Sequence, residues 1–208
     1  DALPIYMLGV NPLYEFQHSS DRATIIKAFN TVKATYNIWD NLNLSEKISY
    51  DYMTNTNDVL WDRYSNNGGP GGVMQRIISK NEQLNTQTQL TYNKAFGEHN
   101  IDALLGFETE DNKYAYNYLS GQDYPGDLYE LTNAGSTSAD SNIQSYRLTS
   151  FLGRVNYDFG GKYYLSASYR TDGSSRLARD NRWGSFWSVS GTWRSEERRV
   201  GIECWSRW

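Results

Sequence analysis

The stretch that decides the fold runs from Ser150 to Arg194 and reads SFLGRVNYDFGGKYYLSASYRTDGSSRLARDNRWGSFWSVSGTWR. Apolar and polar residues alternate in three successive runs. In the first run, the two sets are Phe151, Gly153, Val155, Tyr157 and Phe159, against Ser150, Arg154, Asn156 and Asp158. A period of two predicts β-strands with one apolar and one polar face. Gly160-Gly161 is predicted to form a tight hairpin turn, because glycine accepts the positive φ that such turns need.

The same alternation extends upstream. We expect further strands at 26–38, 42–52, 84–96 and 101–107, after an irregular segment at 1–21. The expected connections alternate strictly between short and long: 40–41, 54–83, 97–100, 111–145, 160–161 and 171–184. Within 111–145, the tyrosines at 114, 116 and 118 are consistent with a strand extension. In an antiparallel meander this alternation places all tight turns at one end and all long loops at the other, as in outer-membrane barrels.

Strand length also favours a membrane barrel. We expect strands of about 10–14 residues, whereas strands of globular proteins most often have about 5–6 and a tilted membrane-spanning strand needs about 9–11. The aromatic residues near the expected strand ends are typical of interfacial girdles. The prediction is an all-β, antiparallel up-and-down meander with lipid outside and water inside. Seven strands do not close a typical even-numbered barrel, so we expect a piece of one. The alternative is a soluble carbohydrate-binding β-sandwich, whose strands also alternate.

The amino-acid composition excludes further classes of protein. Aromatic residues make up 15% of the chain, which favours β-structure. Mean hydropathy is −0.72 and no apolar run is long enough for a transmembrane helix. The net charge of −4 gives no basic patch for nucleic acid. The single cysteine, Cys204, excludes an intrachain disulfide framework. The first residues show no signal-peptide pattern, so we expect a cytoplasmic protein, a mature form or a fragment.

Beyond this pattern, the sequence resembles the barrel of the SusC/RagA-like TonB-dependent outer-membrane transporters. The resemblance rests on GRVNY, a tyrosine-rich strand, R-x-DGSSR, NRWG and an aromatic strand ending in W-R, in that order between residues 153 and 194. It is supported by NPLYE at 11–15, LTYNKAFGEHNIDALLGFE at 90–108 and L-x-x-L-x-NA at 128–134. Together these motifs cover most of residues 11–194.

The resemblance implies a barrel of about 22 strands, filled by an N-terminal plug domain, in the outer membrane of a Gram-negative bacterium. It implies import of oligosaccharides or peptides with a SusD-like surface lipoprotein, energised through the TonB complex. A passive porin would lack the plug. We expect residues 1–197 to form part of the barrel. Residues 198–208, RRVGIECWSRW, lose all alternation and are expected to be a spurious or frameshifted tail.

No catalytic or cofactor site is predicted. His18 and His99 lack the spacing of a metal site, and the glycine-rich stretch at 65–72 lacks the Lys-Ser/Thr ending of a phosphate loop. The residues expected in loops facing substrate or partner are Trp61, Tyr64, Tyr124, Asp172 and Arg176. For the three aromatic residues the alternative is packing within the loops. For the segment 172–176 a strand-exit turn, with Gly173 in the left-handed region, is the preferred interpretation. The residues expected to face the lumen are Lys33, Lys47, Arg154, Asn156 and Arg170.

Overall fold

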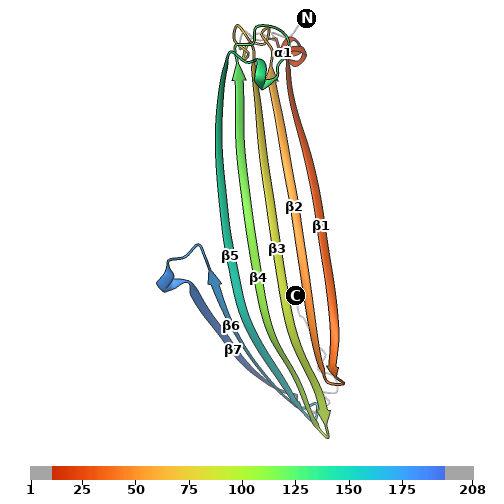
Figure 1. The fold of residues 1–208 in the computed structure, drawn as a ribbon. Coiled ribbons are helices and arrows are strands. Elements are labelled where there is room, and N and C mark those ends of the chain that lie inside the picture. The colour runs from red at the N-terminus through yellow and green to blue at the C-terminus, as the bar shows by residue number, and fades with distance from the viewer. Residues whose placement is uncertain (1–10, 195–208) are drawn as a thin grey trace, which may run out of the picture. The chain divides into compact units, whose positions relative to one another are not determined.

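A computed structural model describes residues 11–194, and these form one open, antiparallel sheet (Figure 1). Its seven strands are hydrogen-bonded in chain order, which confirms the predicted all-β meander. The strands are β1 (Ser19–Trp39), β2 (Leu42–Trp61), β3 (Val73–Phe96), β4 (His99–Gln122), β5 (Ser136–Phe159), β6 (Tyr163–Ser174) and β7 (Trp183–Trp193). The described residues contain no second sheet, so the sandwich alternative is wrong for them. No helix within residues 11–194 has the length and apolar character needed to cross a bilayer.

Two compact units divide the chain. Unit 1 comprises residues up to 32, 48–85 and 110–147, and unit 2 comprises residues 33–47, 86–109 and 148 onward. Each of the strands from β1 to β5 therefore contributes residues to both units, whereas β6 and β7 lie in unit 2. The expected tail at 198–208 lies outside the described residues, so that prediction stays untested.

Strand length differs from the prediction. The strands from β1 to β5 contain 20 to 24 residues, about twice the predicted length. The predicted loops at 54–83 and 111–145 are wrong over most of their length, since the chain leaves the sheet only at 62–72 and 123–135. The extension suggested by the tyrosines at 114, 116 and 118 is present in β4. The third loop also shortens, from 171–184 to 175–182.

The strand extensions lie in unit 1 and are held by polar pairs rather than by an apolar face. Arg76 donates two hydrogen bonds to Asp58, at 2.6 and 3.3 Å, and Tyr146 donates one to Glu110 at 2.8 Å. The ammonium of Lys80 lies 2.7 Å from Glu82. Charged and amide residues interrupt the hydrophobic period of two along most of these extensions, which is why the sequence pattern failed to predict most of their length.

Tight turns join the strands as predicted, with small differences in their bounds. The turns are 40–41, 97–98 and 160–162, and the two glycines of the last have φ of 60° and 67°. Lys162 N–H donates to Phe159 C=O at 3.0 Å, so this turn is one residue longer than predicted. Gly160 N–H donates to Glu98 C=O at 2.7 Å, which ties two turns of unit 2 together.

The predicted irregular segment before β1 is also wrong in part. Pro12–His18 form a short helix, α1, and β1 begins directly after it at Ser19. Asn11 caps the helix, because its side-chain oxygen accepts a hydrogen bond from Leu13 N–H at 3.1 Å. Pro12 occupies the first helical turn, where a missing N–H has no cost. Asn and Pro are common in loops, but they also favour the first positions of a helix, which is how they act here.

Candidate functional site

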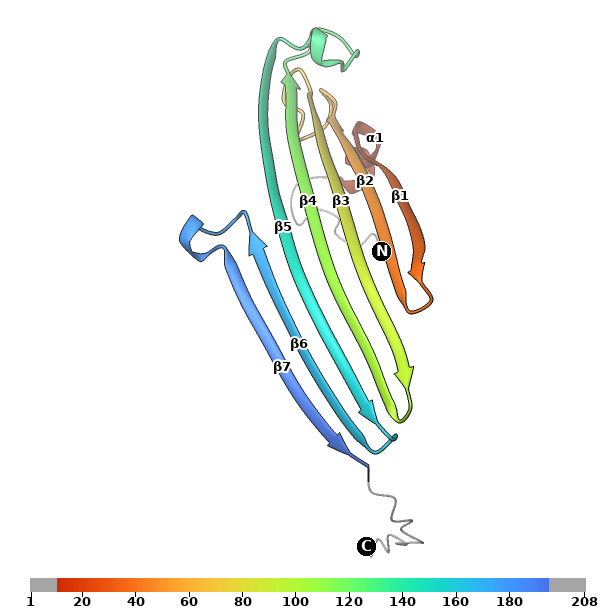
Figure 2. The same cartoon turned by 60° about the horizontal axis from the view of Figure 1, so that its bottom comes forward.

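Two chemically opposite faces characterise the sheet in unit 2. β5, β6 and β7 lie side by side (Figure 2). Their register pairs Val155 with Ala167 and Asn156 with Ser166, and then Ala167 with Val189 and Ser166 with Ser190. Directly opposed residues of an antiparallel pair point to the same side of the sheet. We call the apolar face the side formed on β5–β7 by Phe151, Val155, Tyr157, Phe159, Tyr163, Leu165, Ala167, Tyr169, Trp187, Val189 and Trp193. The polar face is the side formed by Ser150, Arg154, Asn156, Asp158, Ser166, Ser168, Arg170, Asp172, Ser188, Ser190 and Thr192.

Aromatic residues form two clusters on the apolar face. Next to the tight turns, the His99 ring lies 5.3 Å from that of Phe96 and 4.8 Å from that of Phe159, and His99 Nδ1 lies 2.6 Å from the Tyr157 hydroxyl. Farther along the strands, the Phe151 ring lies 4.9 Å from that of Phe107 and 6.2 Å from that of Trp183. Between the clusters lie the aliphatic row Val155, Ala167 and Val189 and, next to it, a row that contains Tyr169 and Trp187. An aliphatic band between two aromatic clusters is typical of a barrel surface in contact with lipid.

A carboxylate stands at an apolar position of the alternation on β2. Glu46 of β2 breaks the apolar alternation of its strand. In the structure its Oε2 accepts a hydrogen bond from the Thr88 hydroxyl at 2.5 Å. A hydrogen-bonded partner lowers the cost of placing a polar group among apolar side chains.

Several separate groups of hydrogen bonds join polar side chains on the polar face. Asn156 Nδ2 donates to Asp102 Oδ1 at 3.1 Å, and its Oδ1 accepts from the Ser166 hydroxyl at 2.7 Å. Asn100 donates to Asp158 at 3.1 Å, and the hydroxyls of Ser168 and Ser188 lie 2.7 Å apart. This chemistry suits contact with water rather than with lipid.

Arg170 is the most connected residue of the polar face. Its Nε donates to Asp172 Oδ1 at 2.8 Å, and its Nη2 donates to Glu108 Oε2 and to the Ser150 hydroxyl, both at 3.2 Å. Gln87 donates to the other oxygen of Glu108 at 2.7 Å. Arg170 therefore joins β4, β5 and β6 through their side chains.

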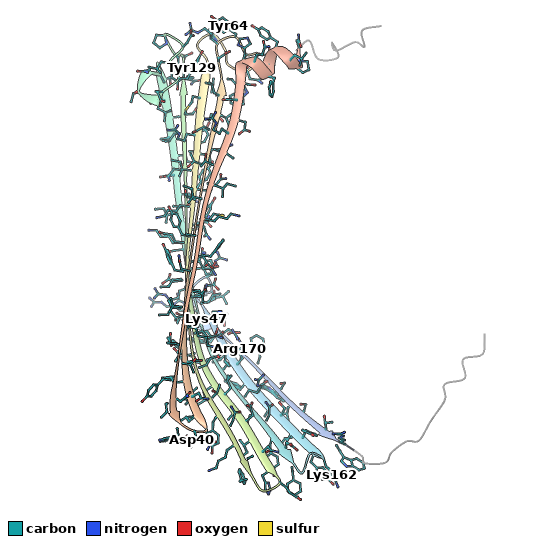
Figure 3. All side chains as sticks on the ribbon, turned by 90° about the vertical axis from the view of Figure 1, so that its right-hand side faces the viewer. Asp40, Lys47, Tyr64, Tyr129, Lys162 and Arg170 are labelled. Atoms are coloured by element: carbon teal, nitrogen blue, oxygen red, sulfur yellow. The ribbon has the colours of Figure 1, made fainter. Side chains whose placement is uncertain are left out.

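The predicted lumen residues are distributed as follows. Arg154, Asn156 and Arg170 lie together on the polar face. Lys47 is exposed in the segment of β2 that belongs to unit 2, and Figure 3 labels it together with Arg170. Lys33 is exposed on β1. Whether these residues line a lumen stays a prediction.

In unit 1, α1 is fastened to the loop at 62–72. His18 Nδ1 donates to Asp62 Oδ2 at 2.7 Å, and Asp62 Oδ1 accepts from the N–H groups of Tyr64 and Ser65 at 2.8 and 3.0 Å. Glu15 accepts from the Ser65 hydroxyl at 2.8 Å and from the N–H of Asn66 at 2.5 Å. Burial would raise the pKa of Asp62, but these hydrogen bonds outweigh it, so the pKa lies below its ordinary value. No sequence signal pointed to this clamp, because His18 and Asp62 are far apart in the chain.

Arg63 fastens the same loop to the loop at 123–135. Its backbone N–H donates to the Tyr129 hydroxyl and its Nη2 to the carbonyl of Tyr124, both at 3.1 Å. Its Nε lies 3.2 Å from Asp127 Oδ1. Tyr124 N–H also donates to the carbonyl of Gly71 at 3.1 Å. The two loops of unit 1 therefore form one cluster.

The predicted loop aromatics occupy different environments in this cluster. Tyr124 is 3% exposed and packs edge-on against Tyr129, with ring centres 5.1 Å apart, so its ring packs within the loops. Trp61 is half-buried at the end of β2. Tyr64 is 57% exposed, with its ring 5.4 Å from that of His18, and presents an open aromatic surface (Figure 3).

The segment 172–176 departs in part from the strand-exit turn predicted for it, and its contact with substrate or partner stays a prediction. Asp172 and Gly173 are strand residues of β6, and Gly173 does not have positive φ, so the left-handed turn is wrong. Gly173 instead leaves room for Trp183 on β7, since a Cβ at Gly173 would lie 3.0 Å from the indole ring. Ser174 Oγ accepts from Arg176 N–H at 3.3 Å, as expected for a strand-exit turn one residue later.

No cluster of metal-ligating side chains occurs within residues 11–194. Among known proteins, the chain is similar to the TonB-dependent receptor SusC of Bacteroides thetaiotaomicron, with 26% identity over 189 residues that cover 90% of this chain and 19% of SusC. It is 29% identical over 133 residues to the TonB-dependent receptor P39 of Formosa agariphila, covering 58% of this chain and 13% of P39. The chain is thus similar in sequence to part of these TonB-dependent receptors. No protein-family profile matches it.

Solved structures share the fold of this chain. The fold matches the RagAB peptide transporter with a TM-score of 0.82 at 20% identity, over 89% of this chain and 22% of that one. The RagAB peptide importer in its open-open state gives a TM-score of 0.80 at 22% identity, over 89% and 22% of the two chains. The chain thus spans about a fifth of these relatives. The open seven-stranded sheet matches part of a TonB-dependent receptor barrel.

Proposed function

We propose that the chain is a segment of the barrel wall of a TonB-dependent active transporter in the outer membrane of a Gram-negative bacterium. The observation that carries the proposal is the opposition of two faces in unit 2. One face has an aliphatic band between two aromatic clusters, and the other has groups of hydrogen-bonded polar side chains. A bilayer on one side and water on the other would stabilise each face.

The strand extensions in unit 1 are evidence that a large part of this wall is exposed to water. A strand of 24 residues is about 80 Å long at roughly 3.3 Å per residue, well beyond the apolar band of about 25 Å found on outer-membrane barrels. The extensions of β2–β5 pair through charged and amide side chains. We infer that they stand in water beyond the bilayer and carry the clustered loops.

The relatives support a proposal for the cargo and the partners. SusC is named a TonB-dependent receptor, and RagAB is described as a peptide transporter. We propose that the whole transporter imports oligosaccharides or peptides with a SusD-like surface lipoprotein, and draws energy through the TonB complex. In this chain the exposed ring of Tyr64 is the strongest candidate for cargo contact, because an open aromatic face stacks on sugar rings or on peptide side chains.

Deletion of the gene in its source bacterium tests the proposal. The expected result is loss of uptake of a defined oligosaccharide or peptide, restored by the full-length gene, with the protein in the outer-membrane fraction. Collapse of the proton gradient should abolish that uptake, which separates active transport from a passive porin. Uptake that is unchanged in the deletion strain, or a protein in the soluble fraction, would contradict the proposal.

A further inference from the structure

Arg154 is a cation without a partner on the polar face of unit 2. It is exposed and makes no ion pair or side-chain hydrogen bond with any residue in the range 11–194. Arg170, also on the polar face, is bound by Glu108 and Asp172. Asp102, on the neighbouring strand, already accepts a hydrogen bond from Asn156. Glu108 and Arg170 also line this part of the sheet and pair with each other, so Arg154 is the guanidinium there whose N–H groups are not bound by a carboxylate of the described residues.

A hollow of 580 Å³ adjoins Arg154 on this sheet. Its lining combines the guanidinium with the hydroxyls of Ser168 and Ser188 and with apolar surface from Leu104, Leu152 and Phe186. Arg154 is paired in register with Ser168, and Ser168 with Ser188, so the three side chains form one row across β5, β6 and β7. The hollow thus has a charged, hydroxyl-bearing row beside an apolar wall.

The two serine hydroxyls have one hydrogen to spare. They lie 2.7 Å apart, so one hydroxyl donates to the other. Each hydroxyl carries one hydrogen, and the second hydrogen of the pair remains available for an external acceptor. A guanidinium that presents parallel N–H groups, together with one hydroxyl donor, matches the oxygens of a carboxylate.

We propose that Arg154 and the Ser168–Ser188 pair form a binding site for a carboxylate attached to an apolar group, carried by a solute in the lumen. The carboxylate pairs with the guanidinium and accepts from the free hydroxyl, while the apolar group packs on Leu152 and Phe186. The proposal rests on the proposed function in one respect, namely that the polar face of unit 2 lines a water-filled lumen.

Chemical modification of the full-length protein in outer-membrane vesicles tests this site. Phenylglyoxal modifies accessible guanidinium groups, and peptide mass spectrometry reports the reaction at each arginine separately. Benzoate serves as the probe, because it joins a carboxylate to an apolar ring, and benzamide serves as its neutral counterpart. The expected result is that Arg154 reacts, that benzoate protects it and that benzamide does not. Arg170 should react slowly under all conditions because its guanidinium is already bound.

A matched pair of variants separates the site from general effects. The double variant Ser168→Ala/Ser188→Ala should raise several-fold the benzoate concentration that protects Arg154, because it removes both hydroxyls and with them the free hydrogen. Ser190→Ala, two residues along the same strand, should leave protection unchanged. Failure of Arg154 to react, or equal protection by benzoate and benzamide, would overturn the proposal. The assay needs no transport, so absence of uptake in the deletion test would count against the proposed function alone.

Discussion

At the scale of single residues, neighbouring positions on a strand of unit 2 should differ in how well they tolerate a charged side chain. Val155 lies on the apolar face and Asn156 on the polar face of β5. Val155→Arg should destabilise the membrane-folded protein by about 2–4 kcal/mol, because it places a charge against lipid. Asn156→Arg loses two hydrogen bonds but stays in water beside Asp102, so its cost should be smaller, at about 1 kcal/mol or less. Urea titration of the full-length protein in liposomes measures both, and the reverse order would contradict the assignment of the faces.

Gly173 gives a second prediction at this scale. A side chain at Gly173 would contact the Trp183 indole at 3.0 Å, whereas one at Gly191 would meet only a backbone oxygen at 4.0 Å. Gly173→Val should therefore destabilise the protein by about 1–3 kcal/mol, as overpacking typically does. Gly191→Val is the matched control on β7 and should cost less. Equal unfolding midpoints for the two variants would show that the Trp183 contact does not matter.

At the scale of elements, the clamp between α1 and the loop at 62–72 depends on pH. The pKa of Asp62 is lowered in the folded state from 3.8, so its stabilising effect is present above about pH 4 and is lost as the pH falls through the lowered value. Limited proteolysis at 62–72 should therefore accelerate in acid. Asp62→Asn should accelerate cleavage at neutral pH as well, and should remove the part of the acid response that belongs to Asp62. A cleavage rate unaffected by Asp62→Asn would contradict the clamp.

The strands and turns also show which parts of the fold the sequence pattern could predict. The tight turns, the strand order and the apolar face were predictable, because lipid on one side imposes a period of two on unit 2. The parts of β2–β5 next to the loops at 62–72 and 123–135 were mostly not predictable. Polar residues there interrupt the period of two, while backbone hydrogen bonds still pair the strands. The left-handed turn predicted at Gly173 was wrong because the need for glycine comes from Trp183, whose ring packs against it from the next strand.

The site was only partly predictable for a related reason. Alternation alone assigned Arg154, Asn156 and Arg170 to one face, and the register bears out that grouping. Whether an arginine has an ion-pair partner depends on residues of other strands, such as Glu108 for Arg170. These residues are far away in the sequence, so a local pattern does not predict the pair. The burial of Tyr124 likewise depends on Tyr129 and on the backbone of the other loop.

At the scale of the whole molecule, the account requires that the loops and the tight turns lie on opposite sides of the outer membrane. Cysteine labelling with a membrane-impermeant maleimide on intact cells tests this directly in the full-length protein. Gly126→Cys places the thiol in open space in the loop at 123–135, and Glu98→Cys places it in an exposed tight turn. Mass spectrometry of the modified peptides keeps the introduced thiols separate from Cys204. We predict that Cys at position 126 is labelled on intact cells, and that Cys at position 98 is labelled only after the outer membrane is permeabilised. Equal labelling of both positions on intact cells would contradict a membrane-spanning wall.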